Sequence, residues 1–205
     1  MNCPIALVAV ASSTLVGLSL QASLIQATDA GFGPNALTVD TSTGLEWLDL
    51  GASSGLSYEQ VLADTQPGGV FSGFRFATAQ EVFQLYASAG IPGPGDYALS
   101  SPAISFLFTL VGPSGSINGL PGMLGLSATP GSGGQYAPAI YVTGINGSSE
   151  YWVNSATLYG DATAYPELSS WLVKDVPENT DATIYGLAAA GLFGCGWLLR
   201  RSSAA

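Results

Sequence analysis

The chain has 205 residues, 47% of them hydrophobic and 9% charged, with a formal net charge of −10, which leaves room for one ordinary domain plus processing segments. Because only four residues are Lys or Arg, no basic patch exists to release counterions from phosphates, which argues against nucleic-acid binding. There is no histidine, and both cysteines lie in terminal apolar segments, so the usual zinc sites and His-dependent nucleophilic systems are excluded.

The first 27 residues have the outline of a secretory signal peptide, because a long apolar run is followed by small residues before the first acidic one. Cleavage after Ala22 or Ala27 fits a small-x-small site. The run has no Lys or Arg ahead of it, and a buried N-terminal helix or a retained anchor is the alternative. We predict a signal peptide over 1–27, beginning with a signal helix.

The stretch NALTVDTSTGLEWLDL, which follows, alternates apolar and polar residues around a Thr-Gly turn. This pattern predicts a hairpin or two short strands. The inward row expected from the alternation is Leu37, Val39, Leu45 and Trp47.

Three helices are predicted after the hairpin. LSYEQVLADT has helical spacing with Ser57 as its N-cap. The next begins at Thr78, with Glu81 in the capping-box position and one apolar stripe before Gly90 ends it. SPAISFLFTLVG is too short to cross a membrane and indicates a buried helix after Pro102.

The later part of the chain has strand-like runs separated by Gly- and Ser-rich loops: GMLGLSA, YAPAIYVTG, SEYWVNSATLYG and SSWLVKD. An early strand, then helices, then several strands predict an α+β domain over 28–175, with a mainly antiparallel sheet and two or three helices. The last strand is expected to return beside the first.

The succession TGLEWLDL, LSYEQV, GFRFATAQEVFQLY and SWLVKD resembles a group of bacterial extracellular domains, some of them related to C-type-lectin-like folds. In that group a Gly-Leu-x-Trp strand precedes a Gly-aromatic-Arg-x-x-Thr helix start and a late aromatic strand. The matching positions are mostly hydrophobic, so the resemblance implies a fold more than a function.

The last 24 residues begin with an uncharged segment over 182–199, close to the minimum that crosses a hydrocarbon core. Arg200 and Arg201 follow at once. Because positive charge beside a span stays on the cytoplasmic side, we predict a C-terminal transmembrane helix whose two arginines stop translocation and leave the domain outside.

Val176, Pro177 and Glu178, the span and the basic pair together resemble the PEP-CTERM sorting signal of exported bacterial proteins, although Asn179 stands where a second proline is usual. This resemblance implies that 176–205 is a sorting signal, processed by a membrane-embedded exosortase-like enzyme near Pro-Glu. It also implies association with exopolysaccharide, and passage through the inner membrane to the cell surface or the extracellular space. A permanent C-terminal anchor is the alternative.

The candidate site residues in the domain are few. Arg75 is the only basic residue before Lys174, and we predict that it anchors the turn before the Thr78 helix, with a ligand contact as the alternative. Asp161 and Glu167 flank a loop that could present oxygen ligands to calcium, with solvated carboxylates as the alternative. We therefore predict no cofactor, and calcium is the one metal considered.

Two pairs of carboxylates lie close together in the sequence. Glu46 and Asp49 are three apart on a probable strand, so they are expected to point to opposite faces and not to cooperate. Glu59 and Asp64 are expected to be solvated at a helix end.

Aromatic side chains are the last candidates, because some of them could form a sugar-stacking platform while most belong to the core. They are Trp47, Tyr58, Tyr97, Tyr136, Tyr141, Trp152 and Trp171. We predict an exported, non-catalytic surface or matrix protein that interacts with exopolysaccharide. The alternatives are a secreted glycoside hydrolase that uses two carboxylates, and a structural spacer.

Overall fold

The computed structural model describes residues 24–117, 119–143 and 150–176. Beyond these residues lie most of the predicted signal peptide and the rest of the predicted sorting signal, with Pro177, Glu178, the span over 182–199, Arg200 and Arg201. No helix in the described part of the chain is long and apolar enough to cross a membrane. The domain predicted over 28–175 is described in full apart from the two internal gaps.

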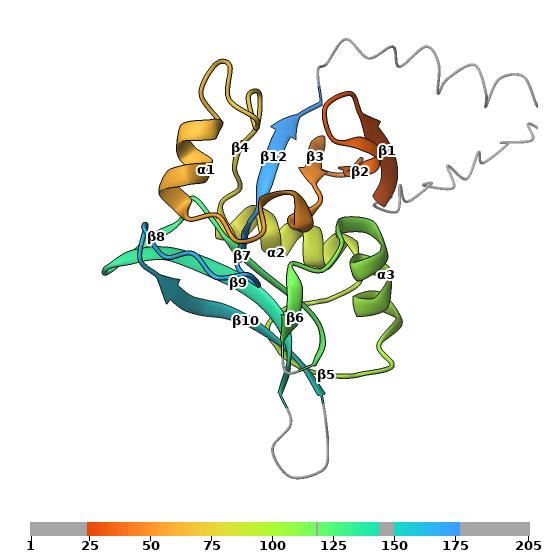
Figure 1. Cartoon of the computed structure of the whole chain (residues 1–205). Helices are drawn as coiled ribbons and strands as arrows, with labels where there is room; N and C mark the ends of the chain where they lie inside the picture. The colour runs from red at the N-terminus through yellow and green to blue at the C-terminus, as the bar shows by residue number, and fades with distance from the viewer. Residues whose placement is uncertain (1–23, 118, 144–149, 177–205) are drawn as a thin grey trace, which may run out of the picture.

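Sheet A is a five-stranded antiparallel sheet with the order β1-β2-β3-β12-β4 (Figure 1). Its strands are β1 (Leu24–Asp29), β2 (Gly33–Asp40), β3 (Leu45–Leu48), β12 (Leu172–Asp175) and β4 (Arg75–Phe76). The predicted hairpin is confirmed as β2 and β3. The last strand, β12, returns to this sheet beside β3, whereas the first strand, β1, lies at the edge and pairs with β2.

Sheet B has the order β11-β7-β9-β10-β5, and all its pairs are antiparallel except β11 with β7. Its strands are β5 (Gly95–Ala98), β7 (Leu120–Leu126), β9 (Gly134–Thr143), β10 (Glu150–Tyr159) and β11 (Ser169–Ser170). Two short strands add to it, β6 (Gly115–Ile117) beside β7 and β8 (Pro130–Gly131) beside β9. The predicted late strands are confirmed, and β5 is additional.

Three α-helices occur in the described residues: α1 (Tyr58–Asp64), α2 (Ala79–Ser88) and α3 (Pro102–Val111). Ser57 and Thr78 each form a complete capping box, so both predicted helix starts are confirmed. Pro102 opens α3, and a short 3₁₀ helix, η1 (Leu50–Ser53), follows β3. Mainly antiparallel sheets with three helices make this an α+β domain, as predicted.

The β2–β3 hairpin buries both of its faces. Its register pairs Leu37 with Leu48 and Thr38 with Trp47. Leu37, Leu45 and Trp47 are buried as predicted. Because paired residues share a face, Leu37 and Trp47 point to opposite sides of the sheet. Trp47 packs in the core cluster that includes α2 and α3, whereas Leu37 packs with α1.

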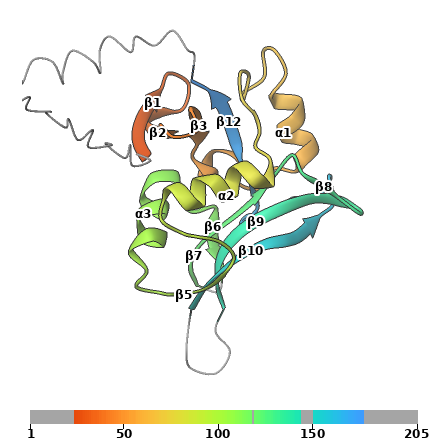
Figure 2. The ribbon, with the colours of Figure 1, turned by 180° about the vertical axis from the view of Figure 1, so that it is seen from behind.

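Trp171, just before β12, joins the two sheets. Its ring meets Trp47 of β3 and Tyr86 of α2 edge-on, with centroids 6.1 and 5.9 Å apart. Its Nε1 donates to the carbonyl of Pro138 in β9 at 3.1 Å. A β-carbon on Gly125 of β7 would lie 2.7 Å from the indole, so only glycine leaves room for it. The core therefore lies between sheets A and B, where Figure 2 shows α2.

The strand register places both ends of the described chain in one row of sheet A. The register aligns Leu24 of β1 with Asp40, Asp40 with Leu45, and Leu45 with Asp175 of β12. Three strand spacings separate the two outer residues of this row, which amounts to roughly 14 Å.

Candidate functional site

The structure separates the predicted platform aromatics into core and surface residues. Trp47 and Trp171 are buried in the core and are not available to a ligand. Tyr58 stacks on Phe76 with centroids 4.3 Å apart. Tyr97 is half-buried and donates its hydroxyl to the carbonyl of Gly93.

Tyr141 and Trp152 remain at the surface and lie side by side. They are register partners on β9 and β10, and their rings meet at 70° with centroids 5.6 Å apart. Trp152 is 38% exposed. A cross-strand aromatic pair of this kind presents both a ring face and a ring edge to solvent.

A shallow hollow of about 210 Å³ lies beside this pair, lined by Leu124, Tyr141, Thr157 and Tyr159. Tyr159 in turn meets Tyr165 edge-on with centroids 6.2 Å apart, and Tyr165 is 54% exposed. We call Tyr141, Trp152, Tyr159, Tyr165 and this hollow the aromatic face.

Sequence reasoning missed Tyr159 and Tyr165. In a regular strand the residues on the face of Trp152 are at even positions, which excludes Tyr159. The pairing of β10 with β9 is irregular between Asn154 and Thr157, where two residues of β10 oppose one residue of β9, Pro138. This bulge brings Tyr159 onto the same hollow as Tyr141, and no simple sequence signal marks it.

Two hydrogen-bonded polar pairs lie on or just after the strands that carry the hollow, and Thr157 of the first pair lines it. Nδ2 of Asn154 donates to Oγ1 of Thr157 at 3.2 Å, and Nε2 of Gln135 donates to Oδ1 of Asp161 at 3.3 Å. Gln135 is the register partner of Tyr159, so the second pair adjoins the aromatic rings. Amide and carboxylate groups beside aromatic rings are the combination that binds sugar hydroxyls and stacks on sugar rings.

In the loop considered for calcium, Asp161 accepts a hydrogen bond from Gln135. Glu167 packs along the backbone of Gly115. Among the residues that the structure describes, no three acidic side chains are grouped so that they could hold a metal ion.

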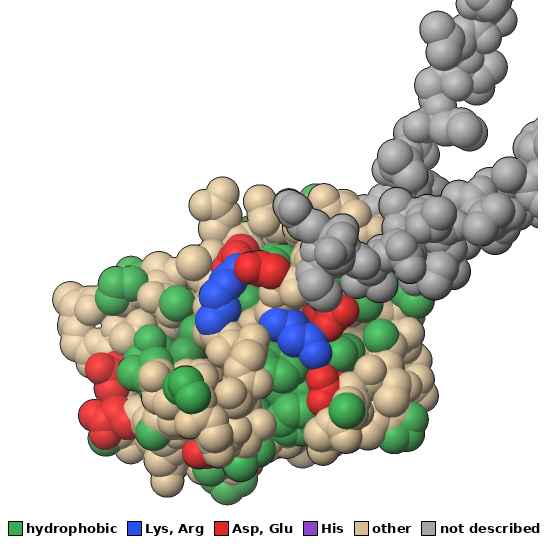
Figure 3. Space-filling view, turned by 90° about the horizontal axis from the view of Figure 1, so that it is seen from above, with side chains coloured by type: hydrophobic (Ala, Val, Ile, Leu, Met, Phe, Trp, Pro, Cys, Tyr) green, Lys and Arg blue, Asp and Glu red, His purple; other side chains and the backbone are tan. Residues whose placement is uncertain are grey.

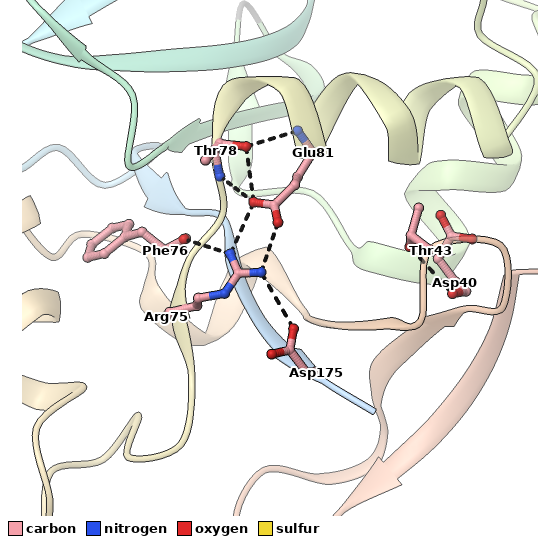
Figure 4. Close-up of polar contacts among 7 residues, drawn as sticks. All are labelled: Asp40, Thr43, Arg75, Phe76, Thr78, Glu81 and Asp175. Atoms are coloured by element: carbon pink, nitrogen blue, oxygen red, sulfur yellow. Dashed lines mark hydrogen bonds and ion pairs between the residues drawn. The ribbon is translucent and has the colours of Figure 1, made fainter. Parts of the chain in front are cut away.

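Arg75 is bonded within the domain (Figure 4). Its NH1 and NH2 donate to the two carboxylate oxygens of Glu81 at 3.0 and 2.8 Å, NH1 also donates to the carbonyl of Phe76, and Asp175 lies 3.6 Å away. Glu81 also accepts from the backbone N–H of Thr78. These bonds lower the pKa of the Glu81 carboxyl, with Arg75 the largest cause. The geometry favours the anchor interpretation of Arg75 over a ligand contact.

Replacing Glu81 tests this anchor. Glu81→Ala removes the capping bond and the ion pair, and we expect the free energy of unfolding to fall by about 1–2 kcal/mol. Glu81→Gln keeps an oxygen for the capping box and loses only the charge, so we expect the free energy of unfolding to fall by less than about 1 kcal/mol. Because folding lowers the pKa of Glu81, its charge stabilises the folded state at pH values above the unfolded-state pKa. The difference in stability between wild type and Glu81→Gln is therefore expected to vanish as the pH falls through the folded-state pKa. Urea unfolding at neutral and acidic pH measures the stability of both variants. A loss of stability in Glu81→Gln that persists in acid would contradict the ion-pair explanation.

Lys174 is also paired within the domain. Its Nζ lies 2.8 Å from Asp29 and 3.2 Å from Glu46, and 4.9 Å from the ring centroid of Phe74. In Figure 3 the basic side chains in view each contact acidic ones. Glu46 is thus bound to Lys174 on sheet A, whereas Asp49 lines a separate hollow, and the two carboxylates share no site.

The aromatic face is the strongest candidate for a ligand site in the described part of the chain. It combines exposed rings, a hollow and hydrogen-bonding groups on β9, β10 and the loop after β10, with Leu124 of β7 also lining the hollow. Comparison with protein families, with curated proteins and with solved structures finds no match for this chain.

Proposed function

We propose that the protein is an exported, non-catalytic surface or matrix protein that binds exopolysaccharide through the aromatic face. The observation that carries this proposal is the surface pair of Tyr141 and Trp152 beside a hollow lined by Tyr141, Thr157 and Tyr159. Sugar rings stack on aromatic side chains through their C–H faces, and amides bind their hydroxyls. The acidic surface suits neutral polymers, or anionic polymers bridged by divalent cations, better than it suits anionic polymers alone.

Export is part of the proposal, and the structure bears on where the signal peptide ends. Strand β1 begins at Leu24, and its residues from Leu24 to Ala27 pair with β2. Cleavage after Ala27 would remove four of the six residues of this strand, whereas cleavage after Ala22 leaves it whole. Of the two predicted cleavage positions, we therefore propose the one after Ala22.

Processing at Val176, Pro177 and Glu178 by an exosortase-like enzyme is the second part. The backbone N–H of Val176 donates to the carbonyl of Gly44 at 3.0 Å, so the folded domain extends to the first residue of the motif. In this proposal the C-terminal helix and Arg200 hold the precursor in the inner membrane before the domain reaches the cell surface or the extracellular space.

The two alternatives differ in what they require. A glycoside hydrolase requires two carboxylates about 5–10 Å apart across a sugar site. The described residues that line the hollow at Asp49 include one carboxylate, and those that line the aromatic face hollow include none. These observations support a binding protein over a hydrolase. A spacer would need no aromatic face.

Binding to the host's own exopolysaccharide tests the proposal. Purified protein is titrated with the polymer, with calcium and then with chelator, while released sugar is measured. Trp152→Ala is expected to weaken binding about tenfold, equivalent to ~1.4 kcal/mol, because it removes half of the aromatic pair. Phe106→Ala is the control, since Phe106 is an exposed aromatic residue on α3 outside the aromatic face.

Each outcome has a meaning. Saturable binding without sugar release, weakened by Trp152→Ala and not by Phe106→Ala, supports the proposal. Sugar release would favour the hydrolase alternative. Absence of binding would favour the spacer, and equal loss in both variants would show that the aromatic face is not the binding surface.

A further inference from the structure

A second hollow lies at Asp49, away from the aromatic face. It has a volume of about 430 Å³, within the usual range of small-ligand sites. Asp49 follows β3, and the other lining residues come from the β1–β2 turn, β2, η1 and the end of α3. They are Phe32, Ala36, Gly51, Ala52, Gly112 and Pro113. We call this the Asp49 hollow, and Asp49 is the one ionisable residue that lines it.

The carboxylate in this hollow has an unsatisfied oxygen. Oδ1 of Asp49 is buried, and among the described residues no donor reaches it. By contrast, the buried Asp40 accepts hydrogen bonds from the hydroxyls of Ser42 and Ser88 at 2.6 and 2.8 Å. Burial raises the pKa of Asp49 to about 6, so the group is mostly ionised at pH 7.5. A partly buried carboxylate with one buried, unbonded oxygen is a group that a ligand can stabilise.

The basic residues of the described domain do not supply that partner. Arg75 is bonded to Glu81, and Lys174 lies between Asp29 and Glu46. A partner for Asp49 therefore has to come from outside these residues.

The chemistry of the hollow selects the class of ligand. A calcium ion takes six to eight oxygens and a magnesium ion takes six, which one carboxylate among apolar side chains does not provide. A neutral sugar would leave the carboxylate without a counter-charge, and an anion would be repelled. A compound with one ammonium group pairs with the carboxylate while its carbon frame contacts Phe32 and the small apolar residues. The net charge of −10 also draws cations to the surface.

We propose that the Asp49 hollow binds a small organic ammonium compound, with the carboxylate of Asp49 holding the ammonium group and Phe32 forming one wall. This site is separate from the aromatic face and does not depend on the proposed polysaccharide binding.

Calorimetric titration of the full chain in nonionic detergent tests the site, with benzylammonium as the probe and benzyl alcohol as the neutral match. We expect saturable binding of benzylammonium and at least tenfold weaker binding of benzyl alcohol. Asp49→Asn, which keeps the shape and removes the charge, is expected to weaken benzylammonium binding at least tenfold. Glu59→Gln removes an exposed charge elsewhere and is expected to leave binding unchanged.

Two further measurements make the test decisive. At pH 5 Asp49 is mostly protonated, so binding by the wild type is expected to fall about tenfold relative to pH 7.5. Ala52→Leu fills the rim of the hollow without touching the charge, and it is also expected to weaken binding. If wild type shows no saturable binding, or if Asp49→Asn and Ala52→Leu both bind benzylammonium as wild type does, the proposal is overturned. Exopolysaccharide binding by the same variants is expected to be unchanged, which separates this site from the aromatic face.

Discussion

Replacing Trp171 with alanine is expected to lower the free energy of unfolding by about 3–5 kcal/mol. The side chain is fully buried, packs edge-on against Trp47 and Tyr86, and donates to the carbonyl of Pro138. Its removal leaves a large cavity between the two sheets and a backbone acceptor without its donor. No other described side chain joins β3, α2 and β9 in this way, so a partial collapse of the cavity is not expected to restore the contacts.

Urea unfolding followed by circular dichroism measures this effect, with Trp152→Ala as the matched control. Trp152 is 38% exposed on the aromatic face, so its loss is expected to change stability by less than about 1 kcal/mol. If the two variants lost equal stability, the assignment of Trp171 to the centre of the core would be contradicted.

The second large effect is expected for Gly134→Ala, at about 2 kcal/mol or more. Gly134 begins β9 with φ +158°, and a β-carbon there would overlap the carbonyl oxygen of Tyr159 in β10. Backbone on both strands would have to move, which opens the pairing of Gln135 with Tyr159. Because Tyr159 lines the hollow of the aromatic face, we also expect weaker exopolysaccharide binding.

Gly133→Ala separates the steric overlap from the cost of placing alanine at a positive φ. Gly133 has φ +125°, and a β-carbon there would meet no atom within 4 Å. Its replacement is therefore expected to lower the free energy of unfolding by only about 1 kcal/mol, the cost of the unfavourable backbone conformation. Exopolysaccharide binding is expected to be retained. Thermal unfolding and polymer titration of both variants provide the comparison, and a Gly133 variant as damaged as the Gly134 variant would refute the steric explanation.

The helix starts could be predicted from the sequence because capping is local. The bonds that begin α1 and α2 join residues three apart, Ser57 with Gln60 and Thr78 with Glu81. Pro102 opens α3 for an equally local reason. The hairpin of β2 and β3 also follows from a short alternating segment with a turn in its middle.

The division into two sheets depends on pairs far apart in the chain, such as Val173 with Trp47, which no local pattern specifies. The first four residues of β1 fall within the predicted signal peptide because an edge strand and the end of an apolar leader have similar composition. The opposite faces of Leu37 and Trp47 do not follow from the alternation, because even spacing places two residues on one face only within a single strand and not across a turn.

The candidate sites were the least predictable part. Tyr141 and Trp152 were among the candidate aromatics, but their separation from buried Trp47 and Trp171 depends on which side of each sheet the core lies. The contribution of Tyr159 depends on a bulge that shifts the strand by one residue. The absence of a basic partner for Asp49 among the described residues depends on where Arg75 and Lys174 find their partners, which is a property of the fold.

Leu24 and Asp175 are aligned in one row of sheet A. The two ends of the domain can therefore be joined without changing how its strands pair. A linker of about five residues spans the roughly 14 Å between the two ends. Joining them would give a circularly permuted domain with new ends in an exposed loop such as that between β8 and β9. The same short distance lets the domain be grafted as an insert into a surface turn of another protein, with both of its sheets intact.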